Sequence, residues 1–178
     1  MRAIQRKRPP FMTRKRWILI SIAVIVSLGV WFGFYFREVM GPRWSELNQA
    51  REAALESGLI ADVEQLNKHV WEEVTWVAEG KNELDQEIYL FMLADGQIET
   101  YDKSRVVSEQ ELRERFKQEK PETEVISISP GRMRGGPAWE IYYTETSDKG
   151  VSHYYRFYRF DETAELLDTF RLPTTTGP

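Results

Sequence analysis

The longest apolar stretch of the chain covers residues 17–36, which contain no charge and no proline. About 20 such residues in a helix rise roughly 30 Å, the thickness of the hydrocarbon core of a bilayer. We therefore predict a transmembrane anchor at residues 17–36, preceded by a basic tail at 1–16 and followed by a linker at 37–43. Gly29 and Gly33 lie one turn apart in this anchor, a spacing that lets two helices pack closely and makes a homodimer one possibility.

Beyond the linker, the pattern predicts a short helix and four strands. Gly41-Pro42 should end the anchor helix, and Ser45 should cap a new helix that continues to about Ser57 and stops at Gly58. The strands that follow alternate apolar and polar residues, except that the third is apolar on both faces, as in the centre of a sheet. They are expected at residues 63–71, 74–78, 88–93 and 97–101, with Asp95-Gly96 as a hairpin turn.

The same order of elements then begins again. Ser108, with Glu111 three residues later, predicts a capped helix that ends before Pro121. Further strands are expected at residues 125–128, 139–144, 153–160 and 164–170, with the glycine-rich residues 130–137 as a loop. Trp76 and Trp139 fall at corresponding places in the two series.

The expected class is therefore α+β, with two repeats of a helix plus an antiparallel meander packed together. The first repeat is predicted at residues 44–104 and the second at residues 105–172, before a frayed tail at residues 173–178.

Charge predicts the orientation of the anchor. Seven of the 24 Lys and Arg residues precede residue 17, and no Asp or Glu does. Basic residues stay on the cytoplasmic side, so the N-terminus should be cytoplasmic and the part from residue 37 onward extracytoplasmic. A cleaved signal peptide is the alternative, but its apolar region is shorter and ends in small residues, which this segment lacks. The exported part has 17 basic against 28 acidic residues, a formal charge of about −11, which disfavours nucleic acid as a partner.

No arrangement of residues in the sequence favours catalysis. There is no cysteine, which excludes disulfides, thiolate metal sites and a lipid-modified cysteine. The two histidines, His69 and His153, are about 80 residues apart and are interpreted as packed strand residues, not as metal ligands or an acid–base group. Short motifs for hydrolases, metalloproteases and phosphate binding are also missing. We therefore assign no catalytic, cofactor-binding or metal-binding residue and expect a protein that is not an enzyme.

A basic and aromatic zone in the second repeat is the candidate for partner binding. Six aromatic residues at positions 142–158 cannot all be buried if the strands alternate, and Tyr and Arg are frequent in the energetic centres of interfaces. Ordinary sheet packing, with arginine stems lying along apolar surface, is an equally good interpretation. The candidate residues are Arg132, Arg134, Tyr154, Arg156, Tyr158 and Arg159.

The chain also resembles a known family. Residues 138–143 (Ala-Trp-Glu-Ile-Tyr-Tyr), 148–150 (Asp-Lys-Gly), 155–161 (Tyr-Arg-Phe-Tyr-Arg-Phe-Asp) and 165–167 (Glu-Leu-Leu) are similar to the PepSY-type signature of a "W-E-V" strand, a "D-x-G" turn and an apolar strand ending in Asp. With the basic tail, the anchor and the repeats, this resembles the TseB-like cell-wall elongation regulators of Gram-positive bacteria. Ala164 departs from the pattern, because such domains usually carry glycine in this turn.

The resemblance implies a tandem cystatin-like ectodomain at the outer face of the cell membrane. It further implies a regulator of cell-wall elongation that is not an enzyme and that binds a class B penicillin-binding transpeptidase, with no catalytic residues to carry over. An alternative function, by analogy with PepSY-like and cystatin-like domains, is a membrane-tethered inhibitor of an exported protease. A hydrolase built on the same fold ranks last.

Overall fold

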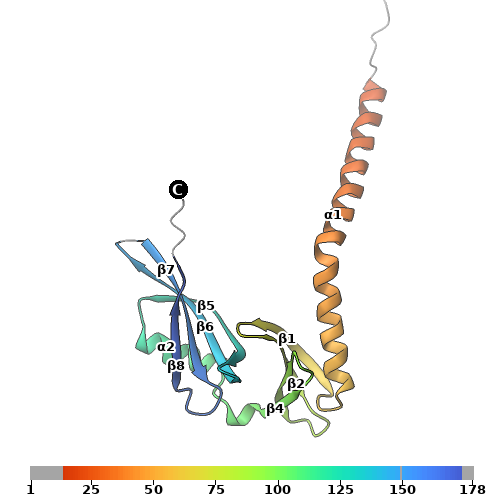
Figure 1. Cartoon of the computed structure of the whole chain (residues 1–178). Helices are drawn as coiled ribbons and strands as arrows, with labels where there is room; N and C mark the ends of the chain where they lie inside the picture. The colour runs from red at the N-terminus through yellow and green to blue at the C-terminus, as the bar shows by residue number, and fades with distance from the viewer. Residues whose placement is uncertain (1–13, 149, 174–178) are drawn as a thin grey trace, which may run out of the picture. The chain divides into compact units, whose positions relative to one another are not determined.

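The protein is described here by a computed structural model, which covers residues 14–148 and 150–173. It has an α+β architecture of an N-terminal apolar helix and two antiparallel four-stranded sheets (Figure 1). The contacts divide the chain into two compact units, one up to Glu46 and one from Leu47 onward. Residues 1–13 of the predicted basic tail and residues 174–178 of the predicted C-terminal tail lie outside the described part.

Helix α1 (Arg14–Glu56) is longer than predicted. It passes through Gly41 and Pro42, so the predictions of a break there and of a helix start at Ser45 were wrong. A proline inside a helix removes one hydrogen bond and bends the helix, but it does not always end it.

The stretch Trp17–Tyr35 is long and apolar enough to cross a membrane. Gly29 and Gly33 lie within this stretch with open space beside them. The end of α1 agrees with the prediction, because Gly58 adopts a positive φ of 69° just beyond it.

Sheet A follows α1 and contains the strands in sequence order. They are β1 (Asp62–Val70), β2 (Val74–Lys81), β3 (Glu87–Leu93) and β4 (Ile98–Asp102). The predicted two-sided burial of β3 is confirmed. Ile88 and Leu90 pack with Ala54 of α1 on one face, whereas Tyr89 and Phe91 belong to the main core on the other.

A short connection, η1 (Lys103–Arg105), leads from sheet A to helix α2 (Glu109–Glu119). The Ser108 side chain accepts a hydrogen bond from the backbone N–H of Glu111 at 3.2 Å, which confirms the predicted cap. The helix ends before Pro121, as expected. Its buried residues Leu112 and Phe116 pack into the main core.

Sheet B contains the remaining strands, again in sequence order. They are β5 (Thr123–Met133), β6 (Gly136–Ser147), β7 (Gly150–Arg159) and β8 (Leu166–Arg171). The prediction of a loop at residues 130–137 was wrong, because β5 and β6 pair up to Met133 and Gly136 and leave only Arg134-Gly135 as the turn. Both turn residues have positive φ, 53° and 76°, the conformation that a two-residue hairpin requires.

One large core joins the two sheets. It contains Val77 and Phe91 of sheet A, Trp139 and Ile141 of sheet B, and Phe116 of α2. The rings of Tyr89 and Phe91 meet those of Trp139 and Phe160 at centroid distances of 5.0–5.8 Å. Aromatic pairs in this geometry stabilise beyond the area they bury. The sheets therefore share their largest hydrophobic contact.

Candidate functional site

The six residues predicted for partner binding do not form one exposed patch. Arg134 and Arg159 are exposed, with 66% and 54% of their side chains accessible. Arg134 pairs with Asp168 at 2.7 Å, and Arg159 pairs with Glu165 at 3.5 Å. Surface pairs of this kind hold their partners weakly. These two arginines are therefore accessible to another molecule.

Arg156, Tyr158 and Tyr154 lie on the face of sheet B that carries α2. The Arg156 side chain is only 11% exposed. It donates to Glu119 at 2.6 Å and to the Tyr158 hydroxyl at 3.2 Å. Tyr158 is buried, and Tyr154 is half-buried and stacked on Tyr143. For Arg156 and Tyr158 the structure agrees with the alternative interpretation of sheet packing, because Arg156 joins α2 to the sheet and Tyr158 is buried.

Arg132 lies inside β5, not in a loop, and is buried. Its guanidinium contacts Glu99 of β4 at 2.8 Å and Glu73 of the β1–β2 turn at 3.4 Å, and it donates to the carbonyl of Gly135. A buried arginine with two carboxylate partners connects sheet A to sheet B. Its predicted place on an exposed loop was therefore wrong.

His69 also contacts residues of the other sheet. Together with Arg132 and Glu140 it forms what we call the polar junction between the sheets. His69 is 6% exposed, and its Nε2 lies 3.1 Å from the backbone carbonyl of Arg132, which fits an Nε2–H donor. Its Nδ1 lies 3.6 Å from the Glu140 carboxylate. A Cβ added at Gly131 would come within 2.4 Å of the imidazole, so only glycine leaves room for His69. The interpretation of His69 as a packed strand residue is confirmed.

Burial controls the charge of this junction. Desolvation lowers the pKa of His69 below its usual 6.5, although its hydrogen bond to the Arg132 carbonyl acts in the opposite direction. Desolvation also raises the pKa of Glu140 from 4.5 to about 7. Both shifts favour the uncharged forms. At neutral pH we therefore expect a neutral His69 beside a Glu140 that is partly protonated.

His153 is half-buried on β7, as the strand pattern predicted. Its Nδ1 lies 2.8 Å from the hydroxyl of Tyr142, and the two rings stack with centroids 5.8 Å apart. Tyr142 also stacks on Tyr155 at 4.8 Å. Within the described residues no carboxylate is paired with His153, and no group of His, Asp and Glu side chains is arranged to hold a metal ion.

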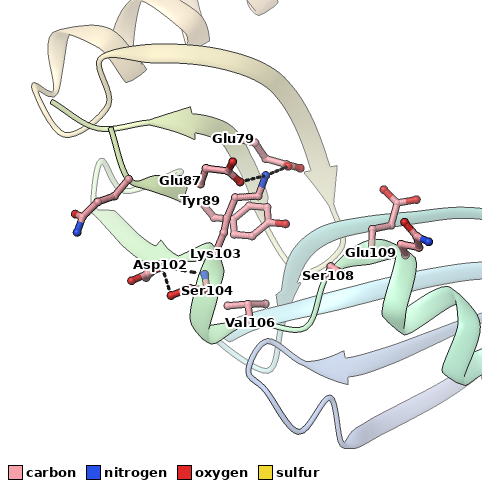
Figure 2. A pocket seen from close by; sticks show the side chains of 11 residues that line it. Glu79, Glu87, Tyr89, Asp102, Lys103, Ser104, Val106, Ser108 and Glu109 are labelled. Atoms are coloured by element: carbon pink, nitrogen blue, oxygen red, sulfur yellow. Dashed lines mark hydrogen bonds and ion pairs between the residues drawn. The ribbon is translucent and has the colours of Figure 1, made fainter. Parts of the chain in front are cut away.

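A pocket that sequence reasoning missed lies between sheet A and the start of α2 (Figure 2). Its volume is about 740 Å³. Lys103 of η1 crosses one wall, 3.3 Å from Glu79 and 3.7 Å from Glu87, with its ammonium above the Tyr89 ring. The residues that line the pocket are Glu79, Gln86, Glu87, Tyr89, Asp102, Lys103, Ser104, Val106, Ser108, Glu109 and Gln110.

The sequence carries only a weak signal for either feature. Glu79 interrupts an apolar strand, and Lys103 and Glu109 flank the predicted start of the second repeat. Their meeting depends on pairing between strands and on the turn of η1, which no local pattern encodes. Arg132 and His69 likewise meet only because the two sheets pack against each other.

Comparison with known proteins identifies a shared fold. No protein-family model matches the sequence, and no curated protein matches it. A solved structure described as the YpmB protein from Bacillus subtilis matches with a TM-score of 0.59 and 20% sequence identity. The match covers 68% of this chain and 96% of that one. At this level of identity, the similarity concerns the fold.

Proposed function

We propose that this protein is a membrane-anchored regulator of cell-wall elongation, not an enzyme, whose tandem cystatin-like domain binds a class B penicillin-binding transpeptidase outside the cell. The observation that carries the proposal is the combination of a membrane-length apolar helix with a YpmB-like fold in one chain. The sequence resemblance to TseB-like regulators supports the same function. The basic tail supports an N-terminus in the cytoplasm.

The anchor gives the proposed function a physical basis. Two proteins in one membrane search for each other in two dimensions, which raises their effective concentration. A weak contact between extracytoplasmic surfaces is then enough for association. Arg134 and Arg159 are the members of the predicted set that remain available for such a contact, since both are exposed and only weakly paired.

Crosslinking in membranes tests the proposal. The full-length protein carries a photoreactive amino acid at position 162, an exposed position three residues from Arg159, and captured proteins are identified by mass spectrometry. We expect a class B transpeptidase among them. The double variant Arg134→Gln/Arg159→Gln, with the photoreactive group at the same position, should reduce that capture.

The matched control is Arg105→Gln/Lys117→Gln, which changes the charge equally at two other exposed positions. Equal capture by both double variants would contradict the role of Arg134 and Arg159. Repeated failure to recover any transpeptidase would contradict the proposed function itself, and selective capture of an exported protease would support an inhibitor.

A further inference from the structure

We propose that the pocket between sheet A and the start of α2 is a binding site for an arginine side chain from a basic segment of a partner protein. The inference does not depend on the partner being a transpeptidase. Three properties of the pocket carry it, namely a tyrosine hydroxyl that opens into the pocket without a partner, an excess of carboxylates and a wall made by Lys103.

The hydroxyl belongs to Tyr89. The residue is 4% exposed, and among the described residues its hydroxyl makes no hydrogen bond. Figure 2 shows the Tyr89 ring beneath the Lys103 ammonium, with the hydroxyl directed into the pocket towards the start of α2. The ring of Tyr89 is buried, whereas its hydroxyl is open to the pocket and has no partner from the described part of the protein there. A ligand donor in the pocket would supply the missing partner.

The charge of the pocket indicates the chemistry of that ligand. Four carboxylates line the pocket, those of Glu79, Glu87, Asp102 and Glu109, together with one cation, Lys103. Arg113 of α2 pairs with Glu109 at 2.8 Å, so the formal charge around the pocket is −2. Glu79 is the innermost of these carboxylates, with 14% of its side chain exposed. Burial raises the pKa of Glu79 above its usual value, and the nearby Lys103 charge offsets this only in part. A second cation would therefore be favoured here.

The shape of the pocket favours a guanidinium over a simple ammonium. A guanidinium is planar and has five donors, which can reach a carboxylate and a phenol oxygen at the same time. Glu87 stands at the rim, with 60% of its side chain exposed, so a further basic residue of the same segment can pair there. The volume of about 740 Å³ lies within the range of ligand pockets and exceeds what one small cation fills.

Lys103 distinguishes a cation site from an anion site. In the free protein its ammonium pairs with Glu79 and Glu87 and so competes with an incoming cation. Removing its charge should strengthen the binding of arginine. If the pocket instead bound an anion through Lys103 and the N-terminus of α2, the same change would abolish binding.

The experiment uses the full-length protein in detergent micelles and a fluorescein-labelled peptide, Gly-Arg-Gly-Arg-Gly amide, measured by fluorescence polarisation at pH 8. The same peptide with citrulline in place of arginine reports binding to the micelle. We expect Glu79→Gln to weaken arginine-peptide binding about 10-fold or more, as expected for loss of a charge-assisted hydrogen bond. Glu124→Gln is the matched control, an exposed glutamate on β5 away from the pocket, and should change binding less than about 2-fold.

Two further variants keep the test decisive if Glu79→Gln folds poorly. Tyr89→Phe should weaken binding about 3- to 5-fold without lowering the melting temperature, because its hydroxyl has no partner in the free protein. Lys103→Gln should tighten binding about 3- to 10-fold.

Three results would overturn the inference. They are equal effects of Glu79→Gln and Glu124→Gln, loss of binding in Lys103→Gln, and binding of the citrulline peptide that is as tight as that of the arginine peptide. Transpeptidase capture is tested at Arg134 and Arg159, so either proposal can fail without the other.

Discussion

Sheet A and sheet B have the same order of strands but are covered differently. In sheet A the central strand β3 is buried on both faces, by the end of α1 on one side and by the shared core on the other. One face of sheet B packs against α2 and belongs to the shared core. The other face carries a smaller cluster of Met133, Ala138 and Phe157, against which Trp71 of the β1–β2 turn packs. Repeated topology therefore does not give equal burial, and each sheet depends on the other.

The corresponding tryptophans show the same difference. Trp139 of β6 is 1% exposed and lies in the shared core. Trp76 of β2 is half-buried and lies under the Lys68 ammonium at 5.3 Å, while its neighbour Val77 enters the core instead. The two tryptophans lie on corresponding strands, as predicted, but only Trp139 belongs to the shared core.

The largest effect is expected from breaking the shared core. Phe91→Ala removes a fully buried ring of sheet A that packs against Phe160 beyond β7. We expect it to lower the free energy of unfolding by about 3–5 kcal/mol. Urea unfolding of the full-length protein in detergent, followed by circular dichroism and tryptophan fluorescence, should show one common transition for both sheets.

Ile98→Ala, at a position on β4 that is 39% exposed, is the control and should cost less than about 1 kcal/mol. Separate transitions for the two sheets, with only one shifted by Phe91→Ala, would show that they fold independently.

A smaller effect is expected at the polar junction. Gly131→Ala forces a methyl group against the His69 ring and should cost about 2–3 kcal/mol. In a His69→Ala background the space is free, so the added cost of Gly131→Ala should nearly vanish. The double-mutant cycle is measured by urea unfolding.

Gly136→Ala is the control for glycine replacement in the same hairpin, because its nearest neighbour would be 4.0 Å away. An unchanged cost of Gly131→Ala with and without His69 would mean that β1 and β5 do not meet through this ring.

Glu140 gives the junction a dependence on pH. In the folded protein Glu140 holds its proton up to about pH 7, whereas in the unfolded chain it loses it near 4.5. Its contribution therefore becomes less favourable as the pH rises from about 4.5 to 7. Glu140→Gln should be more stable than the natural protein at pH 8, by on the order of 2 kcal/mol, and the difference should close towards pH 5.

Thermal unfolding of both proteins from pH 5 to 8 measures this difference. His69 has the opposite sign, since its lowered pKa makes stability fall as the pH drops below 6.5. Both proteins contain His69, so its effect largely cancels in the comparison. A difference between Glu140→Gln and the natural protein that stays constant from pH 5 to 8 would refute the shifted pKa.

The smallest effect concerns the turns before the last strand of each sheet. Gly96, before β4, has a φ of 85°, and Ala164, before β8, has a φ of 47°. Gly96→Ala should cost about 1 kcal/mol, because alanine is disfavoured at positive φ. Ala164→Gly removes that strain but also a buried methyl group worth about 0.8 kcal/mol, so its net effect should stay within about 0.5 kcal/mol. Differential scanning calorimetry resolves the two, and a clear loss in Ala164→Gly would mean that packing dominates.

The sequence predicted those parts of the fold that depend on neighbouring residues. The Ser108 cap, the Gly58 helix end and the apolar strand β3 each follow from a few adjacent positions. Ala164, where the PepSY-type signature that this sequence resembles usually has glycine, adopts the left-handed backbone that glycine favours. Asp161 supports this turn by accepting hydrogen bonds from the backbone of Thr163 and Ala164 at 2.9 and 3.1 Å.

The errors concern features that depend on distant residues. Residues 130–137 have the composition of a loop, yet pairing with β6 makes them a hairpin. Arg132 was expected in that loop, but it lies in β5, where Glu99 and Glu73 compensate for its burial. The pocket at Lys103 was missed for the same reason, since its walls come from separate strands and a helix.

The two-sided burial of β3 also bears on how the chain folds while it is being made. Residues 88–93 are synthesised long before Trp139 and Phe160, which cover their second face. At roughly 5–20 residues per second, several seconds pass in which an apolar strand is available for pairing with other chains. The first half of the protein should therefore depend on a chaperone, or fold only after the second half has been synthesised. A chain truncated after sheet A should aggregate.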